Sequence, residues 1–293
     1  MSLSRYKRAL DFAKRVNHTM LTTEQRTSWD DNGFLILSNF YSDIDVDRID
    51  FITEMAWRGR PRTVVVDDTV TGQRQRLSSW PRSRDESFVK VNDLYLESGA
   101  LRRLILDTRL VPILAGLLGD EAVLINTLTI DHGTAQDNHI DSLFMTPRTT
   151  DALLATWTCL EDVHGDAGPL FYYPGSHKLP VYRFSNGAEH AIHEEMGDWD
   201  LSFRRFIAEH GIERKVFLAK KGDLFVWHSR LIHGGSPIND PERTRKSLVS
   251  HFHTLADWRA FGGDCVPCNG AYWLRRDSHP VPRDELPPVT LAI

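Results

Sequence analysis

The sequence predicts a mainly β protein with flanking helices. From about residue 123 onward, short apolar runs alternate with Gly, Pro and Asp turn residues, the pattern of a β-sandwich or barrel. The first 120 residues instead carry helix-capping signals and helical periodicity. Because no repeat, low-complexity tract or linker interrupts the chain, we expect one domain over residues 1–293. Its expected parts are a mostly helical support with a lid (1–120), a β core (121–260) and a C-terminal extension (261–293).

Capping signals predict the first elements. Thr22 stands three residues before Gln25, which is the spacing of a capping box, and Asn32-Gly33 should end the helix that it opens. A buried strand is expected over Phe34–Leu37. Ser42 can cap a second helix.

Residues 98–118 predict two short helices, broken near Pro112 and ended by Gly119. Two segments are expected to be irregular lids, because long stretches without apolar periodicity are usually functional loops. They are residues 58–86, which hold seven arginines, and residues 183–213, which are rich in charge and histidine.

The β core is predicted from six short apolar runs. They are Val123–Ile130, Ala152–Leu160, Leu170–Tyr173, Lys215–Ala219, Leu224–Trp227 and Ser247–His253.

The bulk composition excludes several functions. A net charge of −5 argues against nucleic acid as a partner, and no apolar run is long enough to span a membrane. Met1 to Leu10 lack the continuous apolar stretch of a secretory signal. Three cysteines give no disulfide framework, so we expect a cytoplasmic setting. Cys265 and Cys268 form a lone C-x-x-C, for which a surface turn is favoured over a zinc or redox site.

His139-Ile140-Asp141 is the most informative motif. Alternate residues of an extended chain point to the same side, so His139 and Asp141 can reach one ion together. His233 lies downstream, at an apolar strand end that runs into glycines, and His228 and His251 are its rivals. Two imidazoles and one carboxylate form the facial triad of non-haem Fe(II) oxygenases, which leaves metal positions open for a co-substrate and O2.

An arginine after the distal histidine suggests the co-substrate. A guanidinium grips a carboxylate through two parallel hydrogen bonds, and 2-oxoglutarate carries a free carboxylate at the end away from the metal. Arg245 begins a predicted strand, whereas Arg243 lies in a turn. We therefore favour Arg245 as the clamp, because a rigid strand holds its geometry better.

These motifs, in this order, resemble the phytanoyl-CoA dioxygenase family of Fe(II)/2-oxoglutarate oxygenases. The resemblance runs over nearly the whole chain, and its most specific block is Ala167–Lys178, AGPLFYYPGSHK. The other similar segments are Leu21–Gln25, Asn32–Leu35, Phe88–Asp93, His139–Asp141, Lys221–Asp223, Thr244–Lys246 and His251–Phe252.

The resemblance implies a double-stranded β-helix (jelly-roll, cupin-like) core, with Fe(II) as metal and 2-oxoglutarate and O2 as co-substrates. It also implies further 2-oxoglutarate contacts by Lys90, Leu128 and Trp157, and Asn126 should point inward beside Leu128. The family often has Ser two residues after the distal histidine. This chain has Gly235 there, so that the hydroxyl of Ser236 is the alternative.

The expected reaction is hydroxylation of an unactivated C–H bond of a small molecule, with release of succinate and CO2. The resemblance implies oxygen rather than halogen transfer, because related halogenases replace the carboxylate of Asp141 with a small residue. Desaturation, epoxidation or ring closure is the first alternative, and a non-catalytic protein that binds a metal or 2-oxo acid is the second. The substrate is open, and so is the oligomeric state.

The arginines of residues 58–84 are candidates for binding an anionic or acyl-thioester substrate, with a solvated loop as the alternative. The aromatic candidates for the pocket are Phe144, Tyr172, Tyr173, Phe184 and Trp227.

Overall fold

The computed structural model describes residues 21–277. Residues 1–20 and 278–293 lie outside this range, and with them the N-terminal stretch on which the argument against a secretory signal depends. The expectation of a single domain over residues 1–293 therefore stays a prediction.

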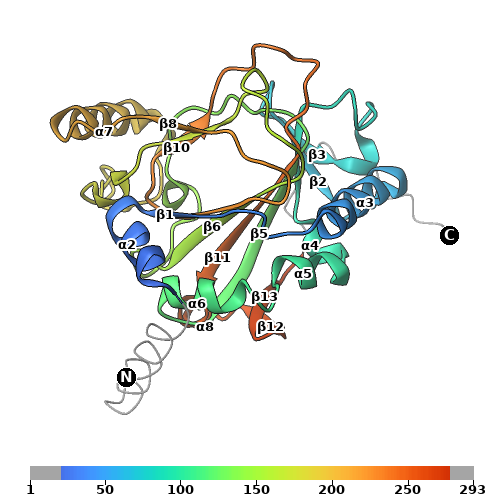
Figure 1. The fold of residues 1–293 in the computed structure, drawn as a ribbon, viewed down its shortest axis with the longest axis horizontal. Coiled ribbons are helices and arrows are strands. Elements are labelled where there is room, and N and C mark those ends of the chain that lie inside the picture. Colours follow the sequence, from blue (N-terminus) through green and yellow to red (C-terminus); the bar gives the residue numbers. More distant parts are fainter. Residues whose placement is uncertain (1–20, 278–293) are drawn as a thin grey trace.

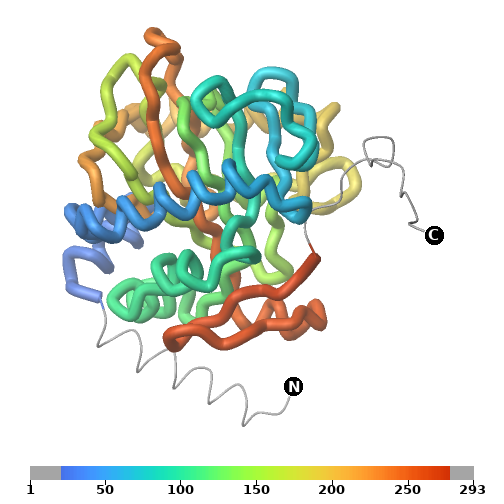
Figure 2. Tube along the Cα trace, turned by 90° about the vertical axis from the view of Figure 1, so that its right-hand side faces the viewer, coloured from blue at the N-terminus to red at the C-terminus, as the bar shows by residue number. Residues whose placement is uncertain are grey.

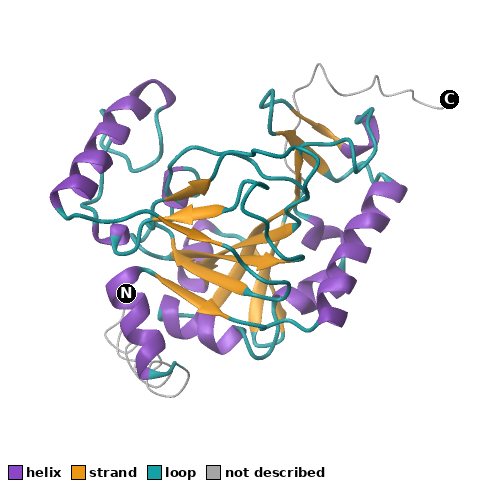
Figure 3. Ribbon diagram, turned by 45° about the horizontal axis from the view of Figure 1, so that its top comes forward, coloured by secondary structure: helices purple, strands orange, loops and turns teal. Residues whose placement is uncertain are grey.

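A ten-stranded sheet forms the centre of the molecule (Figures 1 and 3). Along the sheet the order is β1 (Phe34–Leu37), β9 (Leu224–His228), β6 (Leu153–Cys159), β11 (Ser247–Thr254), β5 (Ala122–Ile130), β4 (Val89–Asn92), β2 (Val65–Asp68) and β3 (Arg74–Arg76). The hairpin of β12 (Asp264–Cys268) and β13 (Ala271–Arg275) joins it through a short parallel pairing of β13 with β5. Neighbouring strands along the main order are antiparallel, and β11 pairs with both β5 and β6.

A second sheet has three strands, in the order β10 (His233–Gly235), β7 (Leu170–Tyr172) and β8 (Lys215–Phe217). Within residues 21–277 the two sheets stay open and do not close into a barrel. The predicted class, mainly β with flanking helices, is confirmed.

The helices are α2 (Thr23–Asn32), α3 (Asp43–Gly59), α4 (Leu94–Glu97), α5 (Gly99–Ile105), α6 (Val111–Leu118), α7 (Met196–Glu209) and α8 (Leu255–Phe261). Figure 2 shows α3 lying across the strands, with α5 and α6 beside it. Of the described helices, none combines the length and the apolar character needed to cross a bilayer.

The two faces of the large sheet have different surroundings. On β11, Leu248 and Phe252 belong to the core that the sheet shares with the helices, together with Ile49 and Leu114. The alternate residues of the strand face a cavity instead. Period-two alternation thus places the core on one face and the candidate site on the other.

Most of the expected elements are present. All six predicted strands are found, and both capping boxes form, at Thr22 and at Ser42. Pro112 stands at the start of α6, and Gly119 ends that helix with positive φ.

The prediction of two irregular lids is wrong in part. Residues 183–213 contain α7, because Trp199 and Phe203 lie one turn apart and bury against a local apolar cluster. Residues 58–86 contain β2 and β3, which extend the sheet edge, and Leu77 and Trp80 are buried in the main core. The sequence argument also missed α8 and the β12–β13 hairpin.

Candidate functional site

His139, Asp141 and His233 lie together. His139 and His233 exchange two backbone hydrogen bonds of 3.0 Å, which joins the loop before the 3-10 turn Asp141–Leu143 to the start of β10. All three side chains are buried, and their ligand atoms lie within 4.8 Å of one another. No other group of His, Cys, Asp or Glu in residues 21–277 is arranged to hold a metal.

Backbone carbonyls orient both imidazoles. Nδ1 of His139 lies 2.8 Å from the Asp137 carbonyl oxygen, and Nδ1 of His233 lies 2.9 Å from that of Leu231. A carbonyl only accepts, so each Nδ1 carries the hydrogen and each Nε2 keeps its lone pair for a metal. Burial, followed by the neighbouring His233, lowers the pKa of His139 to about 3, so the ring is neutral.

Asp141 is buried, which by itself raises its pKa. The nearby imidazoles of His233, His251 and His139 outweigh burial and lower the pKa of Asp141 well below its ordinary value. The group therefore presents an anion beside two imidazoles, which is the donor set that Fe(II) prefers in a facial triad.

The two rival histidines occupy other positions. His228 follows Trp227 in β9 and faces the opposite side of the sheet, where its ring lies 5.6 Å from that of Trp29. His251 faces the cavity, but its Nε2 lies 3.7 Å from Oδ2 of Asp141, and it is not in the three-residue group.

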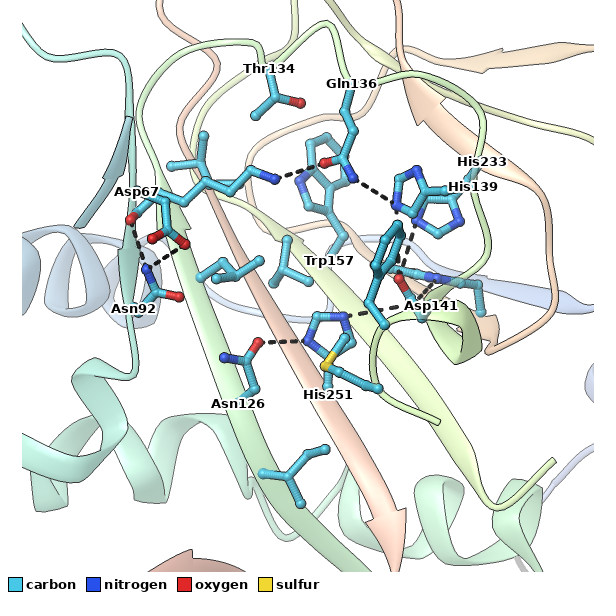
Figure 4. A pocket seen from close by; sticks show the side chains of 18 of the residues that line it. Asp67, Asn92, Asn126, Thr134, Gln136, His139, Asp141, Trp157, His233 and His251 are labelled. Atoms are coloured by element: carbon cyan, nitrogen blue, oxygen red, sulfur yellow. Dashed lines mark hydrogen bonds and ion pairs between the residues drawn. The ribbon is translucent and has the colours of Figure 1, made fainter. Parts of the chain in front are cut away.

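The site opens into a cavity of about 860 Å³ between the two sheets. The large sheet contributes Lys90, Leu128, Trp157 and Val249, and the small sheet contributes residues 233–235. This volume is typical of a pocket for a small organic ligand. Figure 4 shows the metal-ligand candidates at one side of it.

One end of the cavity, which we call the arginine end, is formed by Lys90, Leu128, Trp157, Gly235 and Arg245. Arg245 is 3% exposed, and Nη1 donates to the Gly168 carbonyl (2.9 Å). Its Nε has no partner, and no acidic group within residues 21–277 pairs with it. The guanidinium lies 5.7 Å from the centre of the Trp157 ring.

Burial lowers the pKa of Arg245 to about 10, so the guanidinium is still a cation near neutral pH. Lys90 Nζ donates to Oε1 of Gln136 (2.7 Å), and burial lowers the pKa of Lys90. The buried Arg245 and the half-buried Lys90, neither of them paired with a carboxylate, form a site for an anion, because a buried charge is costly until it is paired.

The opposite end, which we call the apolar end, is formed by Ile125, Met145, Trp258, Phe261 and Leu274. This end is built by α8, β13, the loop after the metal motif, and β5, which carries Ile125. Of these segments the sequence argument predicted only β5. Arg276, which also lines this end, is paired with Asp93, whereas Arg74, which lines the cavity beside Lys90, is paired with Asp67.

The remaining predicted site residues have partners within the chain. Asn126 lines the cavity, but its amide is held between Asp93 and His251. Ser236 is not among the residues that line the cavity, and its hydroxyl accepts from Arg214. Arg243 pairs with Asp240 on the surface.

Of the aromatic candidates, Phe144 and Trp227 line the cavity, whereas Tyr172, Tyr173 and Phe184 pack in apolar clusters behind it.

The arginines of residues 58–84 are largely engaged within the chain. Arg84 binds Asp50 and Asp131, and Arg60 donates to two backbone carbonyls. Of this group only Arg74 lines the cavity, and Asp67 neutralises it. A cluster of free cations for an anionic substrate is therefore absent from this segment. Cys265 and Cys268 lie in β12, outside the candidate metal group.

The site as a whole fits Fe(II) and 2-oxoglutarate. The donor set is that of an iron centre, and the buried guanidinium of Arg245, which has no acidic partner in residues 21–277, lies in the same cavity. A dicarboxylate with one end on the metal and the other on Arg245 would satisfy both.

Comparisons with known proteins agree with this geometry. A family model described as "Phytanoyl-CoA dioxygenase (PhyH)" matches residues 29–247. The curated relatives include "Phytanoyl-CoA dioxygenase, peroxisomal" of Mus musculus, 25% identical over 258 residues, which cover 82% of this chain and 71% of the relative. The protein of the same description from Homo sapiens is 25% identical over 256 residues, with the same coverage of 82% and 71%.

Solved structures show the same fold. The non-heme alpha ketoglutarate dependent carbocyclase SnoK superimposes with a TM-score of 0.61 at 18% identity, over 80% of this chain and 84% of SnoK. EctD from S. alaskensis superimposes with a TM-score of 0.60 at 18% identity, over 82% of this chain and 80% of EctD.

Proposed function

Because the chain belongs to the phytanoyl-CoA dioxygenase family of Fe(II)/2-oxoglutarate-dependent oxygenases, we propose that it hydroxylates an unactivated C–H bond of a small molecule. Succinate and CO2 would be released from 2-oxoglutarate. The observation that carries the proposal is the convergence of His139, Asp141 and His233 in the cavity that also holds the buried Arg245.

Each residue has a defined task in this proposal. His139, Asp141 and His233 would hold the iron, which together with 2-oxoglutarate supplies the oxidising power for an unreactive C–H bond. Arg245 and Lys90 would bind the distal carboxylate of 2-oxoglutarate, because both are cations that line the same end of the cavity. The apolar walls exclude water from the reacting carbon.

The substrate would occupy the apolar end. Its ionised neighbour Arg276 is paired with Asp93 within the chain, so no buried charge there requires a counter-ion from the substrate. We therefore favour an uncharged, mainly apolar small molecule over a phosphate or a thioester bound through the arginines of residues 58–84.

The same residues also fit oxidative ring closure, desaturation or epimerisation. SnoK is described as a carbocyclase and SnoN as an epimerase, and both share the fold. The mass of the product separates hydroxylation, which adds one oxygen atom, from epimerisation, which leaves the mass unchanged, and from desaturation and ring closure, which each remove two hydrogen atoms.

We keep a cytoplasmic location as a prediction, although the mouse and human relatives are described as peroxisomal. We also propose that a small molecule is the only partner of the chain, and that neither nucleic acid nor a membrane is one. The oligomeric state is open.

The decisive experiment is anaerobic titration with Fe(II) and then 2-oxoglutarate, followed by the charge-transfer absorption of the complex. Admission of O2 should then release succinate, with O2 uptake to match. Asp141→Ala should abolish both signals, while Asp240→Ala, which removes an exposed carboxylate outside the site, should keep them. A wild-type protein that binds Fe(II) and 2-oxoglutarate but takes up no O2 and releases no succinate would support the non-catalytic alternative.

A further inference from the structure

The two carboxylate oxygens of Asp141 have different partners. Oδ1 lies 3.9 Å from Nε2 of His139 and 3.7 Å from Nε2 of His233. Oδ2 accepts a hydrogen bond of 2.8 Å from the indole N–H of Trp227, and Nε2 of His251 lies 3.7 Å from the same oxygen. The motif itself does not require this division, because a carboxylate can bind a metal through one oxygen or both.

The indole of Trp227 is held firmly in place. Trp227 lies in β9 between Phe34 of β1 and Ala155 of β6, and it is 2% exposed. The ring packs 5.8 Å from that of Phe225 and 5.1 Å from that of His233. Since an indole nitrogen can only donate, the direction of this hydrogen bond is fixed.

His251 is held from the other side by a line of buried polar groups. Nδ1 of His251 lies 3.0 Å from Oδ1 of Asn126, and Nδ2 of Asn126 donates to Asp93 at 3.0 Å. Asp93 in turn pairs with Arg276. Because the Asn126 amide nitrogen is engaged with a carboxylate, its oxygen faces His251 and accepts from Nδ1–H. Figure 4 shows Asn126, His251 and Asp141 in succession.

We propose that Trp227 is a positioning residue of the metal centre. Its N–H holds Oδ2 of Asp141, with the His251 ring as the wall behind that oxygen, so that Oδ1 alone is offered to the metal. This inference rests on the proposed Fe(II) function. A carboxylate that bound through both oxygens would take a position that the facial triad leaves for 2-oxoglutarate or O2. The role assigned to Trp227 is thus to keep that position open.

Trp227→Phe tests the proposal, because it removes the N–H and keeps an aromatic ring. The probe is Co(II), added to the metal-free protein and followed by its visible absorption, which reports coordination number. We expect Co(II) to bind about tenfold more weakly, as is usual when a partner of a metal ligand is lost, and the shape of the spectrum to change.

Trp199→Phe is the matched control. Trp199 is also a buried tryptophan, 1% exposed, and its Nε1 has no partner within residues 21–277. It lies in α7 and packs in an apolar cluster outside the site. This variant should bind Co(II) with wild-type affinity and spectrum, and it measures the cost of a tryptophan-to-phenylalanine change on folding alone.

Unchanged Co(II) affinity and spectrum in folded Trp227→Phe would overturn the proposal. If that variant does not fold, the wild-type protein labelled with ¹⁵N-tryptophan provides the test. Zn(II) should then shift the indole N–H resonance of Trp227 more than that of Trp199, and equal shifts would overturn the proposal. A wild-type protein that binds neither metal contradicts the proposed function itself, so the two failures are distinguishable.

Discussion

The arginine end and the apolar end of the cavity differ in whether their charged groups are paired within the chain. At the arginine end, Arg245 is a buried cation without an acidic partner in residues 21–277. At the apolar end, Arg276 is paired with Asp93, and His253, a buried histidine that lines the cavity beside Met145 and Trp258, is neutral near pH 7 because burial lowers its pKa to about 4. The first end therefore requires an anion, whereas the second selects its ligand by shape and apolar contact.

This difference teaches how one cavity can serve two ligands. A buried unpaired charge costs several kcal/mol, and a carboxylate that pairs with it recovers that cost as binding energy. No such charge stands at the apolar end, so a dicarboxylate gains nothing by binding there. The electrostatics thus direct 2-oxoglutarate to one end and leave the other for the substrate.

The largest expected effect comes from removing the unpaired charge. Arg245→Met keeps much of the side-chain volume and loses the cation, so the dissociation constant of 2-oxoglutarate should rise about 100-fold or more, as is usual for a charge-assisted pair. The measurement is anaerobic titration of the Fe(II) protein with 2-oxoglutarate.

Arg243→Met is the control for this change, because Arg243 lies two positions away and pairs with Asp240 on the surface. Its 2-oxoglutarate affinity should equal that of the wild type. If Arg245→Met binds 2-oxoglutarate as tightly as the wild type does, the charge of Arg245 does not bind this ligand, and the proposed difference between the two ends is wrong.

The arginine end could be predicted from the sequence because charged residues carry information in short motifs. Arg245 follows His233 along the chain, and its place at the start of an alternating strand favoured it over Arg243. Lys90, Leu128 and Trp157 came from resemblance to a family rather than from the residues themselves. The family pattern did not reveal that the Ser236 hydroxyl is bonded to Arg214.

The apolar end could not be predicted for a physical reason. Met145, Trp258 and Leu274 are apolar residues of the kind that fill every core, and only the packing of the loop after the metal motif, α8 and the β12–β13 hairpin turns them toward a cavity. The role of Trp227 was hidden in the same way, because a tryptophan in an apolar strand gives no sign that its N–H meets a carboxylate.

The fold shows the same limit. Both capping boxes predicted helix starts correctly because the signal is local. The helix α7 was missed because its apolar residues, such as Trp199 and Phe203, are diluted by charge.

The second prediction tests whether His253 is neutral. The ordinary pKa of a histidine is 6.5, and burial lowers that of His253 to about 4. Between pH 6.5 and about pH 4 the unfolded chain binds a proton at His253 that the folded chain does not bind. The contribution of neutral His253 to folding stability is therefore complete above pH 6.5 and is lost as the pH falls through this range. The loss attributable to this residue is at most about 3 kcal/mol.

His253→Gln removes the titrating ring and keeps an amide that can donate to the Met145 carbonyl, as the imidazole does. Urea unfolding at about pH 7 and about pH 4.5 measures the loss of stability on acidification. The variant should lose less stability than the wild type. A loss as large as that of the wild type would mean that the apolar end already holds a charged histidine.

The third prediction concerns the second cation of the arginine end. Lys90→Met should raise the dissociation constant of 2-oxoglutarate about tenfold, less than Arg245→Met does, because an ammonium makes a point contact rather than a paired one. Burial lowers the pKa of Lys90, so wild-type affinity should decline as the pH rises toward that lowered value. The Lys90→Met variant should not show this decline in affinity. If the affinity of the variant still declines as the pH rises, the decline is caused by another group.

The smallest effect is expected at the mouth of the apolar end. Phe261 lines the cavity, and its side chain is 50% exposed. Phe261→Ser should weaken binding of the neutral fluorophore N-phenyl-1-naphthylamine about fivefold, because about 1 kcal/mol of apolar contact is lost. Its 2-oxoglutarate affinity should stay at the wild-type value.

Phe51→Ser is the matched control, since Phe51 is 63% exposed on α3 and does not line the cavity. If both variants weaken the fluorophore equally, the probe binds exposed aromatic surface in general. Weakening by Phe261→Ser alone, without any change in 2-oxoglutarate affinity, would show that the two ends bind their ligands independently. That independence is expected because a neutral ligand at one end leaves the buried guanidinium at the other unaffected.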